Sequence, residues 1–167
     1  MIKWMTEARR HVGLNEVPGV ANNPVIMGWA DRLGARVLGI KYTADSVPWC
    51  GLFAAWCIHQ AGIKTPGVSI RAKAWADWGD SVGTTATRPP FGAIAVFGRD
   101  GGGHVGFVES VNNDGSLNIL GGNQGDAVNV RRFARHRLIA LRWPKGVAIA
   151  DPAPWAGSVV IDTNGEA

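Results

Sequence analysis

The chain has 167 residues, of which 46% are hydrophobic and 18% are charged. This length corresponds to about one compact domain, and the composition excludes an intrinsically disordered chain, a coiled coil and a charge-rich tail. The net charge of +4 favours an anionic partner such as a nucleic acid, a lipid headgroup or a bacterial wall polymer.

No segment of the sequence predicts a membrane span or a secretory signal. The apolar stretch over residues 46–60 is interrupted by Pro48 and is shorter than the ~20 residues that a transmembrane helix needs. Four charged residues among the first ten leave no room for the apolar core of a signal peptide. We therefore expect a protein without stable membrane association, made in the cytoplasm, that needs another route to a target outside it.

The first half of the chain carries the signals of helices. A short charged helix is expected over residues 6–12 and ends at Gly13. Asn23 and Pro24 provide an N-cap and a first-turn proline for a second helix, which ends at Gly34.

A third helix is expected to start from a cap at Asp45 or Ser46, to carry Cys50 in its first turn and to end at Gly62. Its apolar positions recur at the spacing of three and four residues that is typical of a helix with one buried face. A fourth, shorter helix is expected over residues 69–79, from a serine cap to a glycine.

Beyond residue 90 the pattern changes from helices to strands. Five short β-branched or aromatic runs follow without intervening helices, at residues 93–97, 104–111, 116–120, 127–133 and 138–143. This order predicts an α+β domain in which the N-terminal helices pack on a five-stranded, mainly antiparallel sheet. We expect a single domain over residues 1–145 and a C-terminal tail over residues 146–167 that packs loosely or not at all.

The two cysteines have different expected roles. Seven residues along one helix separate their α-carbons by about 10 Å, beyond the ~7 Å that a disulfide spans. Cys50 faces the unpaired backbone N–H groups of a helix start, which favour the nucleophilic thiolate, although a small buried apolar residue is the alternative. Cys57, two turns later, fits the buried role, and no zinc-ligand spacing accompanies either residue.

Among the four histidines, His104 has the setting of a site residue. It begins a predicted strand directly after the three glycines at 101–103, which permit the close approach of a backbone or a substrate. His11 and His59 lie among polar neighbours on predicted helices and His136 lies in an arginine cluster, so we interpret these three as surface residues.

That arginine cluster is the densest positive charge of the chain. It consists of Arg131, Arg132, Arg135 and Arg137. The cluster is typical either of a phosphate-binding track or of a solvated strand edge, and the second interpretation is favoured. No nucleic-acid-binding motif accompanies it, so we expect no nucleic acid partner.

A predicted hairpin brings a polar side chain to His104. The Asn-Asn-Asp-Gly sequence at 112–115 predicts the turn, and a loop of these four residues places Asn123 directly opposite His104. A two-residue loop makes Asn123 the diagonal neighbour on the same face. Asn123 is therefore the expected partner of the imidazole, with Asp126 beyond the strand end and a simple turn role for Asn123 as alternatives.

Four segments carry a resemblance to a known family. They read DSVPWCGLF at 45–53, GAIAVF at 92–97, GGHVGFV at 102–108 and LGGNQ at 120–124. In this order they resemble the CHAP and NlpC-type cysteine amidohydrolases and peptidases, especially the single-domain bacteriophage endolysins. The resemblance covers about residues 5 to 145.

The resemblance implies a papain-like core and an amide or peptide bond of peptidoglycan as the substrate. It assigns Cys50 as the nucleophile, His104 as the general base and Asn123 as the third, polar residue. Many members of the family carry a glutamate two residues before the polar residue, where this chain has Gly121. That difference leaves the histidine oriented by a neutral amide.

The expected function is that of an endolysin-like peptidoglycan hydrolase that forms a cysteine thioester. Backbone N–H groups at the start of the third helix would stabilise the oxyanion. Trp49, Trp75 and Trp78 either line a substrate groove or pack in the core, and Asp45 either aids the site or caps the helix. No metal, nucleotide or prosthetic group is implied.

Two other functions remain open at this stage. One is an effector-type cysteine hydrolase or deamidase that acts on proteins, and the other is a wall-binding module without catalysis. A basic single domain fits a monomeric endolysin that reaches the wall through a holin, and it fits a delivered toxin as well. The scissile bond is either the sugar-lactyl amide or a bond within the wall peptides.

Overall fold

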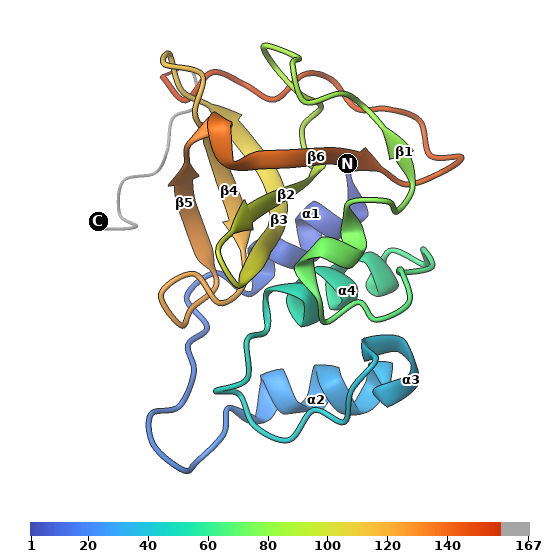
Figure 1. Ribbon diagram of the computed structural model, residues 1–167, viewed down its shortest axis with the longest axis vertical. Coiled ribbons are helices and arrows are strands. Elements are labelled where there is room, and N and C mark those ends of the chain that lie inside the picture. Colours follow the sequence, from blue (N-terminus) through green and yellow to red (C-terminus); the bar gives the residue numbers. More distant parts are fainter. Residues whose placement is uncertain (158–167) are drawn as a thin grey trace.

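The structure, a computed structural model, describes residues 1–157. Within this part the helices precede the strands along the chain (Figure 1). The helices are α1 (Lys3–Arg10), α2 (Pro24–Leu33), α3 (Ala35–Leu38) and α4 (Cys50–Gln60), with 3-10 turns η1 (Ala72–Trp75) and η2 (Arg135–Arg137). The strands are β1 (Asp80–Ser81), β2 (Ile94–Arg99), β3 (Gly102–Val111), β4 (Leu117–Gly121), β5 (Asn129–Phe133) and β6 (Leu138–Trp143).

The predicted α+β class is confirmed, but the sheet has six strands in the described residues rather than five. The strand order is β1-β6-β2-β3-β4-β5, and every pairing is antiparallel. The additional strand, β1, has two residues, which is too short for an alternating pattern to predict. β5 is one of the two edge strands, so Arg131 and Arg132 of the predicted cluster lie along a sheet edge, whereas Arg135 and Arg137 lie in η2.

The second helix forms as predicted, because its capping residues are all in use. The side-chain oxygen of Asn23 accepts a hydrogen bond from the Val25 N–H, Pro24 is the first helical residue, and Gly34 ends the helix. The first helix, α1, begins and ends earlier than residues 6–12. The short helix α3, which follows Gly34 directly, was not predicted.

The third predicted helix, α4, begins at Cys50 itself and has no side-chain cap, so the predicted cap at Asp45 or Ser46 is wrong. The Asp45 carboxylate instead accepts the N–H groups of Val17 and Asn23 and holds the loop before α2. The fourth predicted helix is reduced to the 3-10 turn η1. Ser69 does not cap this turn, because its hydroxyl donates to the Val37 carbonyl of α3.

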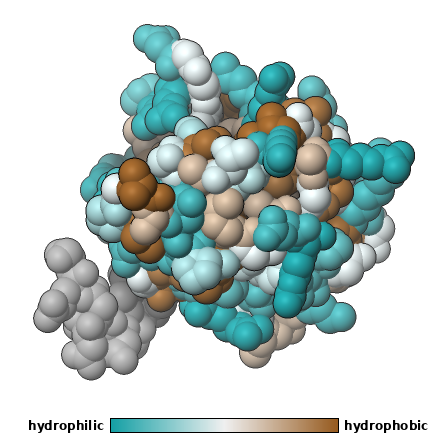
Figure 2. Space-filling view, turned by 90° about the horizontal axis from the view of Figure 1, so that it is seen from below, coloured by the Kyte–Doolittle hydropathy of each residue, from teal (hydrophilic) through white to brown (hydrophobic). Residues whose placement is uncertain are grey.

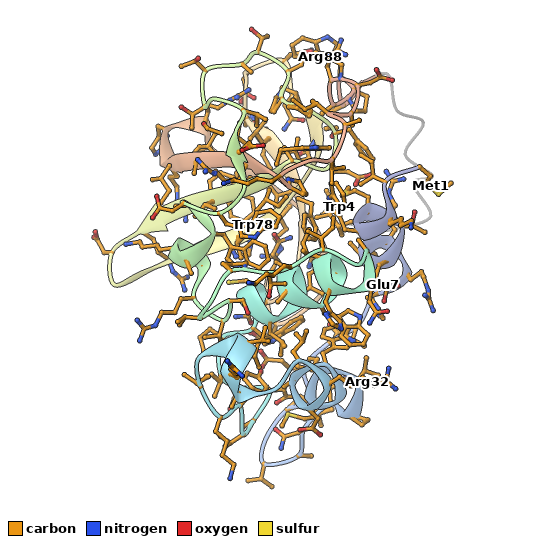
Figure 3. All side chains as sticks on the ribbon, turned by 90° about the vertical axis from the view of Figure 1, so that its right-hand side faces the viewer. Met1, Trp4, Glu7, Arg32, Trp78 and Arg88 are labelled. Atoms are coloured by element: carbon orange, nitrogen blue, oxygen red, sulfur yellow. The ribbon has the colours of Figure 1, made fainter. Side chains whose placement is uncertain are left out.

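Helix α4 is the centre of the packing. The sheet lies on one side of it, α2 on the other, and α1 packs alongside (Figure 1). Its residues are buried on all faces from Cys50 to Ile58, rather than on the single face that the spacing predicts, because both the sheet and the other helices pack on it. Figure 3 shows Glu7 on α1 beside α4, where its carboxylate accepts from the Trp56 indole N–H and bonds His11.

The outer layer of α2 and α3 faces solvent. Figure 2 shows this side of the molecule, with hydrophilic side chains around its edge and a paler, more apolar area in the middle. Arg32 projects outward from α2, and its guanidinium lies 5.8 Å from the centre of the Trp56 ring. None of the helices formed by residues 1–157 has the length and apolar character needed to cross a membrane.

The segment after the last strand packs on the domain over residues 153–156. The Val111 N–H donates to the Pro154 carbonyl, and the Ala156 N–H donates back to Val111. Ala153 has no exposed surface. The remainder of the predicted tail, residues 158–167, lies outside the described residues.

Candidate active site

The Cys50 thiol lies where β4 leaves the edge of β3. The pairing of these strands ends at Phe107 opposite Leu120, and the chain turns away after Gly121. The backbone N–H of Val105 therefore has no partner strand at this point and donates to the Cys50 sulfur. The nucleophile predicted from the sequence thus contacts the residue that follows His104 on β3.

Opposing electrostatic influences act on the Cys50 thiol. The helix start contributes the N–H groups of Gly51 and of Cys50 itself, and these join the Val105 N–H and the charge of Arg99 in favouring the thiolate. Burial is stronger, because only 6% of the residue is exposed, and the pKa of the thiol is raised above its usual value. The direction of this shift is opposite to the one expected from the helix start alone, because burial outweighs the nearby donors.

The close approach of the chain to the start of α4 requires a glycine. A Cβ on Gly51 would lie 2.3 Å from the Ser69 carbonyl oxygen and 2.4 Å from that of Ile70. Any side chain here would push this loop away from the helix. Gly51 thus keeps the first turn of α4, with its nucleophile, inside the packed domain.

The imidazole of His104 is held by Gln124 rather than by Asn123. The Nε2 atom of His104 lies 2.8 Å from the Oε1 atom of Gln124, whose side chain is buried. Asn123 has a φ of +58°, and this left-handed residue interrupts the alternation of side chains on which the prediction rested. Asp126, the alternative partner, is exposed and also left-handed.

The orientation of the Gln124 amide fixes the tautomer of His104. Its Nε2 group donates to the carbonyl of Ile119 at 3.1 Å and to the Asn129 carbonyl and Oδ1 at 2.8 and 2.9 Å. The oxygen of the amide must then be the atom that faces His104, and it accepts from the imidazole. His104 therefore carries its proton on Nε2, which leaves Nδ1 as the free base.

Gly121 makes room for this hydrogen bond. A Cβ at this position would lie 2.6 Å from Gln124 Oε1 and 3.2 Å from His104 Nε2. The carboxamide of Gln124 thus occupies the space beside the histidine that a side chain on Gly121 would fill. The sequence contained one signal for this role, an amide directly after Asn123, but nothing in the strand pattern favoured the second amide over the first.

The ring of His104 is packed and neutral. It stacks on Phe133 with ring centres 4.9 Å apart and an angle of 6° between the planes. Burial, together with the charges of Arg99 and Arg137, lowers the pKa of His104 to about 4, and the bond to Gln124 only partly opposes this shift. At neutral pH the site therefore holds a neutral base and a neutral thiol.

The structure brings His104 and Gln124 into direct contact and leaves the Cys50 sulfur on the neighbouring Val105 N–H. The sulfur on α4 thus contacts the residue that follows His104 on β3, and within the described residues no hydrogen bond joins the sulfur to the imidazole. Catalytic pairs are often loosely spaced before substrate binds and tighten in the complex.

The tryptophans predicted to line a groove belong mainly to the core. Trp49 and Trp75 have no exposed surface, and the Trp49 indole donates to Glu16 at 2.7 Å. Trp78 is half-buried, with its ring 5.3 Å from that of Trp75 (Figure 3). Asp45 is 1% exposed and is used in the loop before α2, so its suggested contact with substrate has no support from its position.

The other polar candidates lie apart from this site. His59 and His136 are exposed, as predicted, but His11 packs its ring against Trp29 at 4.9 Å and bonds Glu7. Cys57 is fully buried and has a pKa well above the usual value because of that burial. Among residues 1–157 no group of three or more potential metal ligands occurs.

Part of the chain is similar to a known protein family. Residues 42–123 match the family model of the CHAP domain. The matched segment runs from the loop before α4 to the turn after β4, so it includes both Cys50 and His104 and ends one residue before Gln124. No curated protein and no solved structure matches the chain.

Proposed function

Since residues 42–123 match the CHAP domain family model, we propose that the protein is a peptidoglycan hydrolase that cleaves an amide or peptide bond of the wall through a thioester on Cys50. CHAP domains are typically cysteine- and histidine-dependent amidohydrolases or peptidases related to peptidoglycan. The observation that carries the proposal is the contact of His104 with Gln124 beside the Cys50 thiol.

The chemistry starts from two neutral groups. Nδ1 of His104 takes the proton of the Cys50 thiol as the sulfur attacks the amide carbonyl, and backbone N–H groups at the start of α4 stabilise the oxyanion. The C–N bond then breaks, the leaving amine takes the proton from His104, and a thioester remains. Water loses a proton to His104 as it attacks the thioester, which releases the carboxylic acid and restores the thiol.

The Gln124 hydrogen bond supports both halves of this cycle. It keeps the ring of His104 in one plane and one tautomer, so that Nδ1 stays available to the sulfur. Because the amide is neutral, it stabilises the imidazolium less than a carboxylate would, which agrees with the lowered pKa of His104. The proposed enzyme therefore uses a weak base that is unprotonated over most of the pH range.

The proposal is tested by digestion of purified peptidoglycan followed by mass spectrometry of the soluble products. The expected result is new amino termini or free lactyl groups, and the product masses identify the bond. Cys50→Ala is the inactive control, and Cys57→Ser is the matched control that removes a sulfur outside the site. Wall that stays intact with the wild-type protein would overturn the proposal.

The same products distinguish the other functions. Release of ammonia from protein glutamines without wall cleavage would indicate a deamidase. Sedimentation with the wall without products would indicate a binding module. An endolysin role is proposed on the resemblance of the sequence, and its test is whether expression together with a holin lyses a bacterial host while Cys50→Ala does not.

A further inference from the structure

Two arginines border the candidate site without an acidic partner. Arg99, at the end of β2, is exposed, and a Cβ on Gly102 would lie 3.5 Å from its Nε atom. Arg137, in η2, places its guanidinium 5.8 Å from the centre of the Phe133 ring, which stacks on His104. Both arginines therefore lie close to β3, the strand that carries His104.

Several other arginines of the described residues have hydrogen-bonded partners. Arg9 binds Glu109, Arg10 binds Glu7 at 2.9 Å, and Arg132 binds Asp114. Arg135 donates to backbone carbonyls at both ends of its loop, for example to Ala86 at 2.9 Å. Within residues 1–157 neither Arg99 nor Arg137 has an ion pair or a side-chain hydrogen bond, although Asp100 follows Arg99 in the sequence.

The charges of these two arginines reach the reacting groups. Arg99 acts on both the Cys50 thiol and His104, and Arg137 acts on His104. Within residues 1–157 no carboxylate forms an ion pair with Arg99 or Arg137, so their positive charges beside the site are not compensated. Such a field opposes the imidazolium that forms during catalysis, which is a cost unless a bound anion neutralises it.

We infer that Arg99 and Arg137 bind a free carboxylate of the peptide substrate, close to the amide bond that is cleaved. The planar guanidinium forms paired, charge-assisted hydrogen bonds with a carboxylate, which gives both affinity and orientation. The bound carboxylate also restores the neutrality of the site when His104 takes the thiol proton. This inference rests on the proposed function, because it assigns the chemistry of the substrate at the same site.

Binding to the Cys50→Ala protein tests the inference without the need for turnover. The probe is a synthetic wall stem pentapeptide with free carboxylates, compared by calorimetry with the same peptide in which every carboxyl is a carboxamide. The acidic peptide is expected to bind at least about tenfold more tightly, the effect of one charge-assisted hydrogen bond. Arg99→Gln and Arg137→Gln, made on that protein, are each expected to remove most of this preference.

The matched control is Arg36→Gln, which removes the same charge from an exposed position on α3 and should keep the preference. Equal binding of the two peptides, or no binding of either, would overturn the inference. A loss of preference in the Arg36 variant would also overturn it, because the effect would then reflect net charge. Competition by inorganic phosphate but not by acetate would assign the arginines to a phosphate of the wall polymer instead.

Cleavage by the wild-type protein separates the two proposals. Hydrolysis of both peptides at equal rates would leave the hydrolase standing and remove the carboxylate site. Preferential binding of the acidic peptide without any hydrolysis would leave the carboxylate site standing and remove the hydrolase proposal. If both proposals hold, the wild-type kcat/KM is expected to be higher for the acidic peptide than for the carboxamide peptide. Arg99→Gln should lower kcat/KM for the acidic peptide and retain turnover of the carboxamide peptide.

Discussion

The two cysteines of α4 occupy opposite kinds of environment on one helix. Cys50, in the first turn, is surrounded by backbone N–H groups and lies within reach of an arginine charge. Cys57, in the apolar body of the helix, has no exposed surface, and the charge of Glu7 raises its pKa further. Burial alone makes a sulfur inert, and we expect the sulfur at the polar end of α4 to react because backbone donors accompany its burial.

The largest expected effect separates these two sulfurs by activity. Cys50→Ala should abolish wall hydrolysis, because no other group at the polar end can form the thioester, and its melting transition should stay close to that of the wild type. Cys57→Ala should remain active. Release of soluble wall fragments and thermal melts measure both variants, and hydrolysis by the Cys50 variant at the wild-type rate would contradict the comparison.

The second effect sharpens the description of the polar end. Gln124→Ala removes the acceptor that orients His104, and we expect a loss in kcat of about 100-fold, typical of misplacing a catalytic group. Gln124→Glu should retain much of the activity and move the acid limb of the pH profile upward, since a carboxylate stabilises the imidazolium. A purely structural role would give two variants with the same pH profile.

The third effect is a pH dependence at the polar end. Catalysis needs neutral His104, whose pKa is lowered to about 4, so kcat/KM should hold constant on the acid side until the pH approaches 4 and then fall. An acid limb near 6.5 would show that the imidazole is solvated and would contradict the packed site. Initial rates on a soluble wall peptide, measured between about pH 3 and 7, locate the pH at which activity falls.

The same group links stability to pH. In the unfolded chain the pKa of His104 is about 6.5, so between about 6.5 and 4 the unfolded state binds a proton that the folded state does not. The free energy of unfolding should therefore fall by up to about 3 kcal/mol as the pH drops through this window. Urea unfolding at several pH values measures the slope, and His104→Gln should flatten it.

The smallest effect belongs to the apolar body of α4. Cys57→Ser replaces a buried apolar thiol by a hydroxyl that must be removed from water, and we expect a loss of about 1–3 kcal/mol in the free energy of unfolding. The acid limb of its activity should match that of the wild type. A shift of that limb in the Cys57 variant would mean that the two ends of the helix are coupled.

The predictions from the sequence succeeded where a local signal decided the outcome. Asn23, Pro24 and Gly34 form the cap, first turn and end of α2 through contacts with their immediate neighbours. The segments that contain Cys50 and His104 lie in a matched family model. Gln124 escaped prediction because a left-handed Asn123 redirects the chain after β4, and this turn depends on the packing of the loop against the sheet.

The sequence by itself determined the α+β order, the sulfur at a helix start and the histidine after three glycines, because each depends on residues close along the chain. Only the tertiary structure decided that burial keeps Cys50 a thiol and that Gln124 orients His104. It also placed Trp49 and residues 153–156 in the packed domain. These outcomes depend on contacts between distant segments, whose desolvation and hydrogen bonds no local pattern records.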